Sequence, residues 1–263
     1  MTDIAFHDLP GGPRLAYRFA QGTGPVLVFL PGYKSDMAGS KACALFDRAR
    51  EMGRAALLLD YSGCGLSGGD FAQGTLARWR DEILALVAAL CPGRELVLCG
   101  SSMGGWLMLL VALAIPAQVA GLVGVAPAPD FTEWGFDDAQ QALLATGEVL
   151  YEANPYGPEP TPTHPGFWAD GQGQRLLGRP IALDCPVRLL HGQADPDVPW
   201  AISLRLAEAL RSADVQVTLI KDGDHRLSRE TDIALLVDTV ERLFAALAQS
   251  FAQSLAPPAI PAA

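Results

Sequence analysis

The sequence predicts an α/β protein, in which helices wrap one mostly parallel central sheet of about eight strands. Short, nearly all-apolar runs alternate along the chain with stretches of helical periodicity, as in a sheet buried on both faces. Apolar residues make up 50% of the 263 residues and charged residues only 18%, which excludes a wholly disordered chain. No apolar run is long enough to span a bilayer.

The expected elements follow one another in a regular order. Two strand patterns at residues 4–7 and 15–19 flank Gly11 and Gly12, which predicts an antiparallel hairpin at the start of the sheet. Further strands are expected at residues 26–30, 55–60, 95–99, 120–125, 186–191 and 215–220. Helices are expected between them at residues 40–52, 75–90, 102–114, 200–211 and 229–250.

One long interval, rich in proline and aromatic residues, interrupts this alternation. A structureless loop of that length is unusual in a compact domain, and its aromatic residues favour a folded cap. We therefore expect a core made of residues 1–127 and 181–250, with a cap inserted at residues 128–180. Residues 251–263 are expected to form a flexible tail.

Charge and cysteine content narrow the partners and the compartment. The net charge of −10 argues against nucleic acid as a partner, because phosphate binding needs a basic surface. Residues 111–180 carry eight acidic and two basic residues, a net charge of −6. The five cysteines are odd in number and have no C-x-x-C spacing, which predicts free thiols in a reducing, cytoplasmic setting.

A strand–turn–helix motif carries the candidate nucleophile. Residues 100–104 read GSSMG and match G-x-S-x-G, with an apolar strand pattern before the motif and an apolar helix pattern after it. In that motif the serine lies at a sharp turn with its hydroxyl exposed. Ser102 is therefore the expected nucleophile, and the alternative is that it only caps the helix.

A second stretch matches the same motif in a different context. Residues 65–69 read GLSGG, but they lie several residues beyond the expected strand, and the following Gly-Gly-Asp does not open a helix. We interpret this stretch as a glycine-rich loop over the carboxyl edge of the sheet.

A serine hydroxyl needs a base, and the base needs a carboxylate that orients it. His225 follows the last strand and precedes the last long helix, where this type of sheet brings a base over the nucleophile. His191 ends a strand and is interpreted as structural. Asp195 lies just after that strand and is the favoured acid. Asp197 is the alternative, although it could instead support the start of the next helix.

Backbone N–H groups would form an oxyanion hole. The residue after the nucleophile, Met103, offers one N–H, and Tyr33, in the loop after the first core strand, offers the second. The alternative for that loop is an ordinary Pro-Gly turn. No cluster of histidine, cysteine and carboxylate residues has the spacing of metal ligands, so we expect no metal.

Over nearly its full length the chain resembles the α/β-hydrolase family of serine hydrolases, and within it the abhydrolase-domain protein ten branch. The similar blocks are LPGYKSDM at 30–37, DYSGCG at 60–65, GSSMGGWLM at 100–108, CPVRLLHG at 185–192 and DHR at 224–226. The resemblance implies Ser102, Asp195 and His225 as the triad. It also implies acyl-protein thioesterase or acyl-glucuronide esterase chemistry without a cofactor. The lack of an evident mitochondrial transit peptide suggests a bacterial, cytoplasmic relative.

We therefore expect hydrolysis of a small-molecule ester or acyl thioester through an acyl-enzyme. Four aromatic residues of the insertion could line an acyl pocket, or they could form the cap's own core: Trp134, Phe136, Phe167 and Trp168. The acidic insertion favours neutral or cationic esters over glucuronides. Two alternatives remain open, an aminopeptidase of the same fold and a non-catalytic binding protein on the same scaffold.

Overall fold

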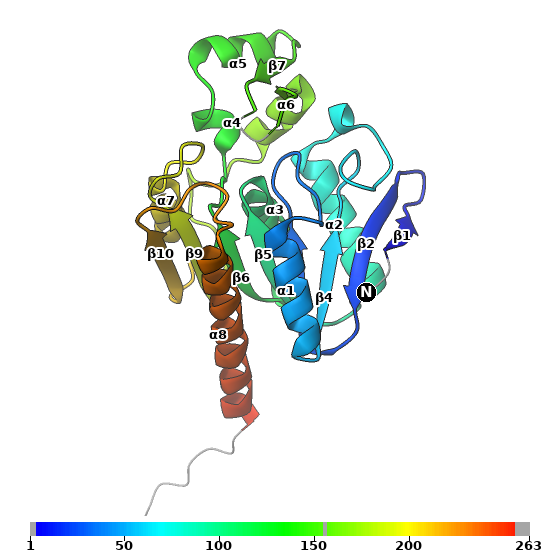
Figure 1. The fold of residues 1–263 in the computed structure, drawn as a ribbon, viewed down its shortest axis with the longest axis vertical. Coiled ribbons are helices and arrows are strands. Elements are labelled where there is room, and N and C mark those ends of the chain that lie inside the picture. Colours follow the sequence, from blue (N-terminus) through cyan, green and yellow to red (C-terminus); the bar gives the residue numbers. More distant parts are fainter. Residues whose placement is uncertain (1–3, 155–156, 256–263) are drawn as a thin grey trace, which may run out of the picture.

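The computed structural model describes residues 4–154 and 157–255, and an eight-stranded sheet forms its centre (Figure 1). The strand order is β1-β2-β4-β3-β5-β6-β9-β10. The pairs β1–β2 and β2–β4 are antiparallel, and every other neighbouring pair is parallel. The strands are β1 (Ala5–Asp8), β2 (Arg14–Ala20), β3 (Thr23–Leu30), β4 (Arg54–Leu59), β5 (Leu96–Ser101), β6 (Val119–Val125), β9 (Val187–Gly192) and β10 (Val215–Ile220).

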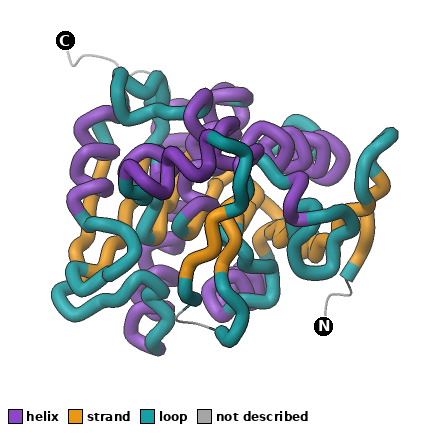
Figure 2. The backbone as a smooth tube through the Cα atoms, turned by 90° about the horizontal axis from the view of Figure 1, so that it is seen from above, coloured by secondary structure: helices purple, strands orange, loops and turns teal. Residues whose placement is uncertain are grey.

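Helices cover both faces of this sheet, which confirms the predicted fold class (Figure 2). Buried side chains of α1 and α8 pack on one face, and those of α2, α3 and α7 pack on the other. These helices are α1 (Ser40–Glu51), α2 (Leu76–Leu90), α3 (Met103–Ala114), α7 (Ala201–Ala209) and α8 (Glu230–Leu255).

The two-sided cover explains why the strands are almost wholly apolar. Along β3, Val26, Val28 and Leu30 belong to one hydrophobic core, whereas Leu27 and Phe29 belong to the other. Successive side chains of a strand point to opposite faces, so both sets must be apolar.

Most expected element boundaries agree with the structure to within a few residues. The terminal hairpin is present as β1 and β2. The last helix continues to Leu255, beyond its expected end at residue 250, and residues 256–263 of the expected tail lie outside the described residues. Among the described helices, none combines the length and the apolar character that a membrane span requires.

Residues 128–180, which we call the insertion, hold additional elements between β6 and β9. They are α4 (Phe131–Trp134), α5 (Asp138–Ala145), β7 (Leu150–Glu152), β8 (Thr161–Thr163) and α6 (Pro165–Gly173). Strands β7 and β8 form a separate antiparallel pair. The insertion follows the carboxyl end of β6 and lies beyond the ends of the strands, at the top of Figure 1.

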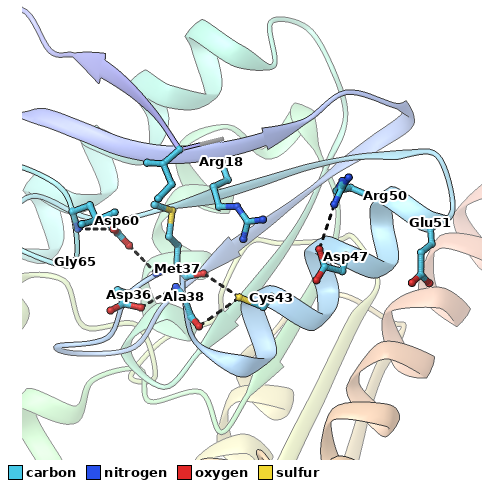
Figure 3. Close-up of a pocket in the computed structure, with 12 residues that line it drawn as sticks. Arg18, Asp36, Met37, Ala38, Cys43, Asp47, Arg50, Glu51, Asp60 and Gly65 are labelled. Atoms are coloured by element: carbon cyan, nitrogen blue, oxygen red, sulfur yellow. Dashed lines mark hydrogen bonds and ion pairs between the residues drawn. The ribbon is translucent and has the colours of Figure 1, made fainter. Parts of the chain in front are cut away.

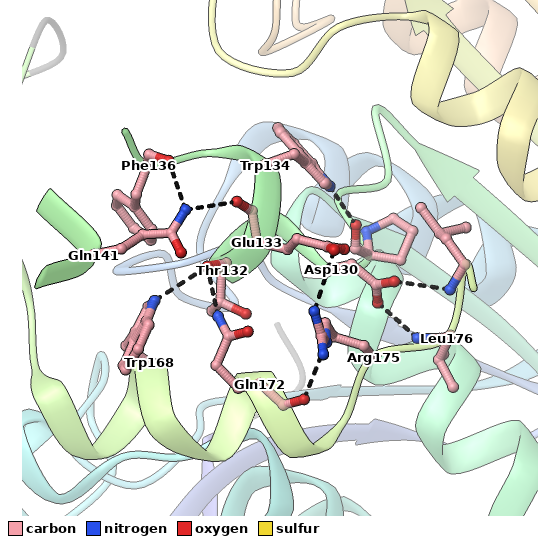
Figure 4. Close-up of polar contacts among 12 residues, drawn as sticks. Asp130, Thr132, Glu133, Trp134, Phe136, Gln141, Trp168, Gln172, Arg175 and Leu176 are labelled. Carbon is pink, nitrogen blue, oxygen red and sulfur yellow. Dashed lines mark hydrogen bonds and ion pairs between the residues drawn. The ribbon is translucent and has the colours of Figure 1, made fainter. Parts of the chain in front are cut away.

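Asp130 joins the two ends of the insertion (Figure 4). Its carboxylate accepts hydrogen bonds from the backbone N–H groups of Leu176, at 2.8 Å, and Leu177, at 2.7 Å. Asp130 is only 1% exposed, and burial raises the pKa of its carboxyl. An ion pair between Glu133 and Arg175, at 3.1 Å, adds a second link between the same two segments.

Replacing this buried carboxylate should destabilise the protein. In Asp130→Ala, two amide donors lose their acceptor, and we expect unfolding free energy to fall by about 2–4 kcal/mol. Urea denaturation measures the change, and limited proteolysis should show faster cleavage within the insertion. Glu159→Ala, an exposed carboxylate of the same insertion, is the control. A stability of Asp130→Ala equal to that of the control would contradict this prediction.

Candidate active site

Ser102 lies at a strained turn between β5 and α3. Its backbone angles are φ 54° and ψ −121°, a conformation that L-residues rarely adopt. The turn packs against β3 so closely that a Cβ atom at Gly104 would lie 2.0 Å from the carbonyl oxygen of Leu30. Likewise, a Cβ atom at Gly100 would lie 2.2 Å from the carbonyl oxygen of Gly104. Both glycines of the motif are therefore required by space.

The three residues predicted as a triad come together. His225 Nε2 lies 3.1 Å from Ser102 Oγ, and His225 Nδ1 lies 2.8 Å from Asp195 Oδ2. The side chain of His225 is 15% exposed and that of Asp195 is 0% exposed. A nucleophile, a base and an orienting carboxylate within hydrogen-bond reach form the arrangement that activates a serine hydroxyl.

Hydrogen bonds hold the Asp195 carboxylate on both oxygens. Oδ1 accepts the backbone N–H groups of Asp197, at 2.8 Å, and Val198, at 2.9 Å. Oδ2 faces His225, and it also lies 3.3 Å from Nε2 of His191. Burial by itself would raise the pKa of Asp195, but the bonds from His191 and His225 outweigh it and hold this pKa below its usual range. The carboxylate is therefore ionised at neutral pH.

Close backbone contact joins the loops that carry the acid and the base. The N–H of Ala194 donates to the carbonyl of Gly223 at 3.0 Å. A Cβ atom at Gly192 would lie 2.1 Å from that same oxygen. The two loops, which follow the neighbouring strands β9 and β10, can approach this closely because glycine occupies both positions.

Further contacts fix the loop that carries His225. The N–H of Leu227, whose φ is 42°, donates to Asp224 Oδ1 at 2.9 Å. The ammonium group of Lys41, from the first turn of α1, donates to the carbonyl of Arg226. Nothing local in the sequence pointed to Lys41, because its partner lies 185 residues away.

The loop of Tyr33 lies beside the nucleophile. A Cβ atom at Gly32 would approach the Cβ atom of Ser102 to 3.3 Å. The Tyr33 hydroxyl donates to the carbonyl of Pro162 at 2.9 Å, and its ring lies 4.9 Å from the ring of Phe167 in α6. Burial raises the pKa of this phenol. Tyr33 therefore links the loop beside Ser102 to the insertion.

The aromatic residues of the insertion occupy different surroundings. Phe136 is 9% exposed and forms a small core with Leu144 and Leu150, against which Trp168 packs. Phe167 is 1% exposed and belongs to the main core. The contacts of Phe136 and Trp168 are those of a core within the cap, whereas Phe167 packs into the main core.

Trp134 lies apart from that small core. It packs, with Phe131 and Leu177, against a cluster formed by Ala128, Val198 and Ile202. The backbone N–H of Ala128 donates to the carbonyl of Ser102 at 3.1 Å, and that of Val198 donates to Asp195. This apolar cluster therefore adjoins both the candidate nucleophile and the candidate acid.

The second G-x-S-x-G match has a structural role. Ser67 Oγ accepts the N–H of Ala16 at 2.8 Å and donates to the carbonyl of Asp60 at 2.7 Å. The stretch is a loop after β4, as expected, and no helix begins at Ser67.

A groove of about 1130 Å³ opens elsewhere, between β2 and α1 (Figure 3). Its carboxylates have partners within the chain, since Asp60 accepts the N–H groups of Met37 and Leu66, and Asp47 pairs with Arg50 at 3.6 Å. The described residues that line this groove include none of the three triad candidates. Hydrogen-bond geometry, and not the size of the hollow, locates the candidate active site.

One group of possible metal ligands occurs among the described residues. Atoms of Asp195, Asp197 and His225 lie within 4.8 Å of one another, although their spacing in the sequence did not suggest a metal site. Both oxygens of Asp195 already accept hydrogen bonds, so the triad geometry accounts for this grouping.

Known proteins share this sequence and this fold. A family model described as serine aminopeptidase, S33, matches residues 23–164. The mitochondrial palmitoyl-protein thioesterase ABHD10 of Homo sapiens is 39% identical over 246 residues, which span 92% of this chain and 80% of that protein. The monoacylglycerol lipase of Mycolicibacterium smegmatis is 26% identical over 267 residues, which span 88% of this chain and 92% of that protein.

Solved structures agree with these matches. Alpha/beta hydrolase domain-containing protein 10 from mouse aligns with a TM-score of 0.86 at 36% identity, covering 93% of this chain and 99% of that chain. Together with the turn at Ser102 and the order of the strands, the matches show that the chain belongs to the α/β-hydrolase family.

Proposed function

We propose that the protein is a serine hydrolase that cleaves carboxylic esters and acyl thioesters through an acyl-enzyme. One observation carries this proposal: the continuous hydrogen-bonded chain from Ser102 Oγ through His225 to Asp195, with distances of 3.1 and 2.8 Å. The names of the human and mycobacterial relatives, a palmitoyl-protein thioesterase and a monoacylglycerol lipase, support it.

The geometry supports a two-stage reaction. Ser102 Oγ attacks the acyl carbonyl carbon while His225 Nε2 takes the hydroxyl proton, which forms a tetrahedral oxyanion. The bond to the leaving sulfur or oxygen then breaks, and His225 returns the proton to the leaving thiol or alcohol. A water molecule, deprotonated by His225, next attacks the acyl-enzyme and releases the free acid and the serine.

Backbone donors would stabilise the oxyanion in both stages. Met103 is the first residue of α3, so its N–H has no partner within the helix. We assign this N–H and that of Tyr33, whose loop lies against Ser102, to the oxyanion hole. Asp195, held ionised, would stabilise the imidazolium that forms on His225.

The insertion is proposed as a cap, with the acyl chain beneath it. The apolar cluster around Ala128, Val198 and Ile202 adjoins the triad on two sides, and Trp134 packs on it. We place the acyl chain along this cluster. Phe136 and Trp168 would then act indirectly, through the small core that gives the cap its shape.

Aminopeptidase activity is the second candidate, favoured by the description of the matching family model. Both reactions use the same triad, so the discriminating feature is the leaving group and not the nucleophile. An aminoacyl arylamide offers a free α-amine and an amide, whereas a p-nitrophenyl ester offers neither. Faster turnover of aminoacyl arylamides than of all esters and thioesters would replace the proposal.

We also propose that the protein acts in the cytoplasm. All five cysteines are free thiols. Burial raises the pKa of Cys64 and of Cys99 to about 12, which keeps both thiols protonated and unreactive at neutral pH. The human relative differs, since its name places it in mitochondria. Recovery of the protein from an organelle or membrane fraction of its source cell would contradict this location.

Removing the Ser102 hydroxyl should abolish hydrolysis. We expect Ser102→Ala to lose about 10⁴-fold or more in kcat on p-nitrophenyl esters and on a palmitoyl thioester. Labelling by a fluorophosphonate should disappear with it. The matched control is Ser67→Ala, the serine of the second G-x-S-x-G stretch, which should keep both activity and labelling. Turnover that survives in Ser102→Ala would refute the proposed nucleophile.

The acidic insertion should disfavour anionic substrates. The excess of six negative charges on residues 111–180 lowers the local concentration of an anion, so an acyl glucuronide should react more slowly than a neutral ester of the same acyl group. Added salt should narrow this gap, because it screens exposed charges. Paired kcat/KM measurements at low and high salt test the idea, and a glucuronide preferred at low salt would show it to be wrong.

A further inference from the structure

A second histidine contacts the acid of the candidate triad. His191 is the penultimate residue of β9 and is 0% exposed. Its Nε2 atom lies 3.0 Å from the carbonyl oxygen of Val198 and 3.3 Å from Asp195 Oδ2. Its Nδ1 atom lies 2.7 Å from Oγ of Ser203, a fully buried residue of α7.

These partners determine which nitrogen of His191 carries the proton. The carbonyl of Val198 and the ionised carboxylate of Asp195 can only accept hydrogen bonds, so the proton must be on Nε2. Nδ1 then has a free lone pair and accepts from the Ser203 hydroxyl. Every polar atom of this buried pair is thereby satisfied.

Asp195 Oδ2 consequently faces two imidazole donors at once. His225 Nδ1 lies 2.8 Å away and His191 Nε2 lies 3.3 Å away, on the same oxygen. A donor from His191 spreads part of the negative charge that would otherwise act on His225 alone. It also restrains the oxygen from turning away from the base.

We propose that His191, whose Nε2–H is directed at Val198 and Asp195 and whose Nδ1 is held by Ser203, is a positioning residue that orients Asp195 Oδ2 toward His225 and moderates the negative charge that this oxygen presents to the base. The inference rests on the proposed function, in which His225 is the base. Loss of the His191 donor should then make His225 hold its proton more tightly. A histidine that merely fills the core between β9 and α7 would have no such effect.

Other charged groups near the base stay unchanged in the experiment. They come from the loop after β9, from the His225 loop itself and from α1, and they are Asp195, Asp197, Asp224, Arg226 and Lys41. Among the described residues, Asp195 is the ionisable group within hydrogen-bond reach of His191. A shift in the titration of His225 therefore reports the contact between His191 and Asp195.

The test titrates His225 directly and compares three variants with the native protein. The imidazole resonances are followed by ¹H–¹⁵N NMR against pH, and the acid limb of kcat/KM is measured in parallel. In His191→Phe, an aromatic ring still fills the site but the N–H donor is lost. The midpoint of the His225 titration should then rise by about 0.5–1 pH unit. His191→Gln can restore an N–H near Nε2 and should return the midpoint to the native value.

Ser203→Ala keeps the imidazole but removes the hydroxyl that bonds to its Nδ1 and holds the ring in place. It should shift the midpoint in the same direction by a smaller amount, and it serves as the test if His191→Phe does not fold. His7→Phe, at the far edge of the sheet in β1, is the control for loss of a histidine and should leave the midpoint unchanged.

Two results would overturn the proposal. An unchanged midpoint in a folded His191→Phe or Ser203→Ala protein would leave His191 as core packing only. A midpoint that falls would mean that Asp195 loses its contact with His225 and that no charge is moderated. Failure of the proposed function is seen separately, as hydrolysis that persists in Ser102→Ala, because the NMR titration does not depend on turnover.

Discussion

The site depends on one steric constraint, the close packing of the turn after β5 against the end of β3. Gly104 approaches the carbonyl of Leu30 so closely that no side chain fits between them. In this turn Ser102 adopts a positive φ of 54° at the start of α3, a conformation that costs energy and persists only where the surrounding packing holds it. The loop that contains Gly32 lies against Ser102, so the nucleophile and the proposed oxyanion hole occupy the same closely packed region.

The parallel strands β9 and β10 bring Asp195 and His225 to the same end of the sheet as Ser102. The loops after β9 and β10 begin side by side, and their glycines let one backbone bond directly to the other. Asp195 is the point at which these loops meet, because its carboxylate accepts N–H groups from its own loop and faces both His191 and His225. A buried carboxylate stays ionised only when it is supplied with donors in this way.

Two sets of contacts hold the insertion in place, one between its two ends and one to the loop beside Ser102. Asp130 joins the two ends of the segment, and Tyr33 bonds to Pro162 from the loop beside Ser102. The proposed cap is therefore in direct contact with the loop that we assign to the oxyanion hole. The neighbouring apolar cluster around Val198 adjoins Ser102 and Asp195, and we propose that the acyl chain lies there.

The sequence by itself determined the fold class and the order of strands and helices along the chain, and it placed Ser102 between a strand and a helix. These features follow from local periodicity and from glycines at fixed spacing. It favoured Asp195 over Asp197 as the acid, and the tertiary structure adds the contact between Asp195 Oδ2 and His225. The contacts of His191 and of Lys41 likewise came only from the folded chain. Their partners are distant loops brought together by the sheet, and such contacts leave no periodic signal in the sequence.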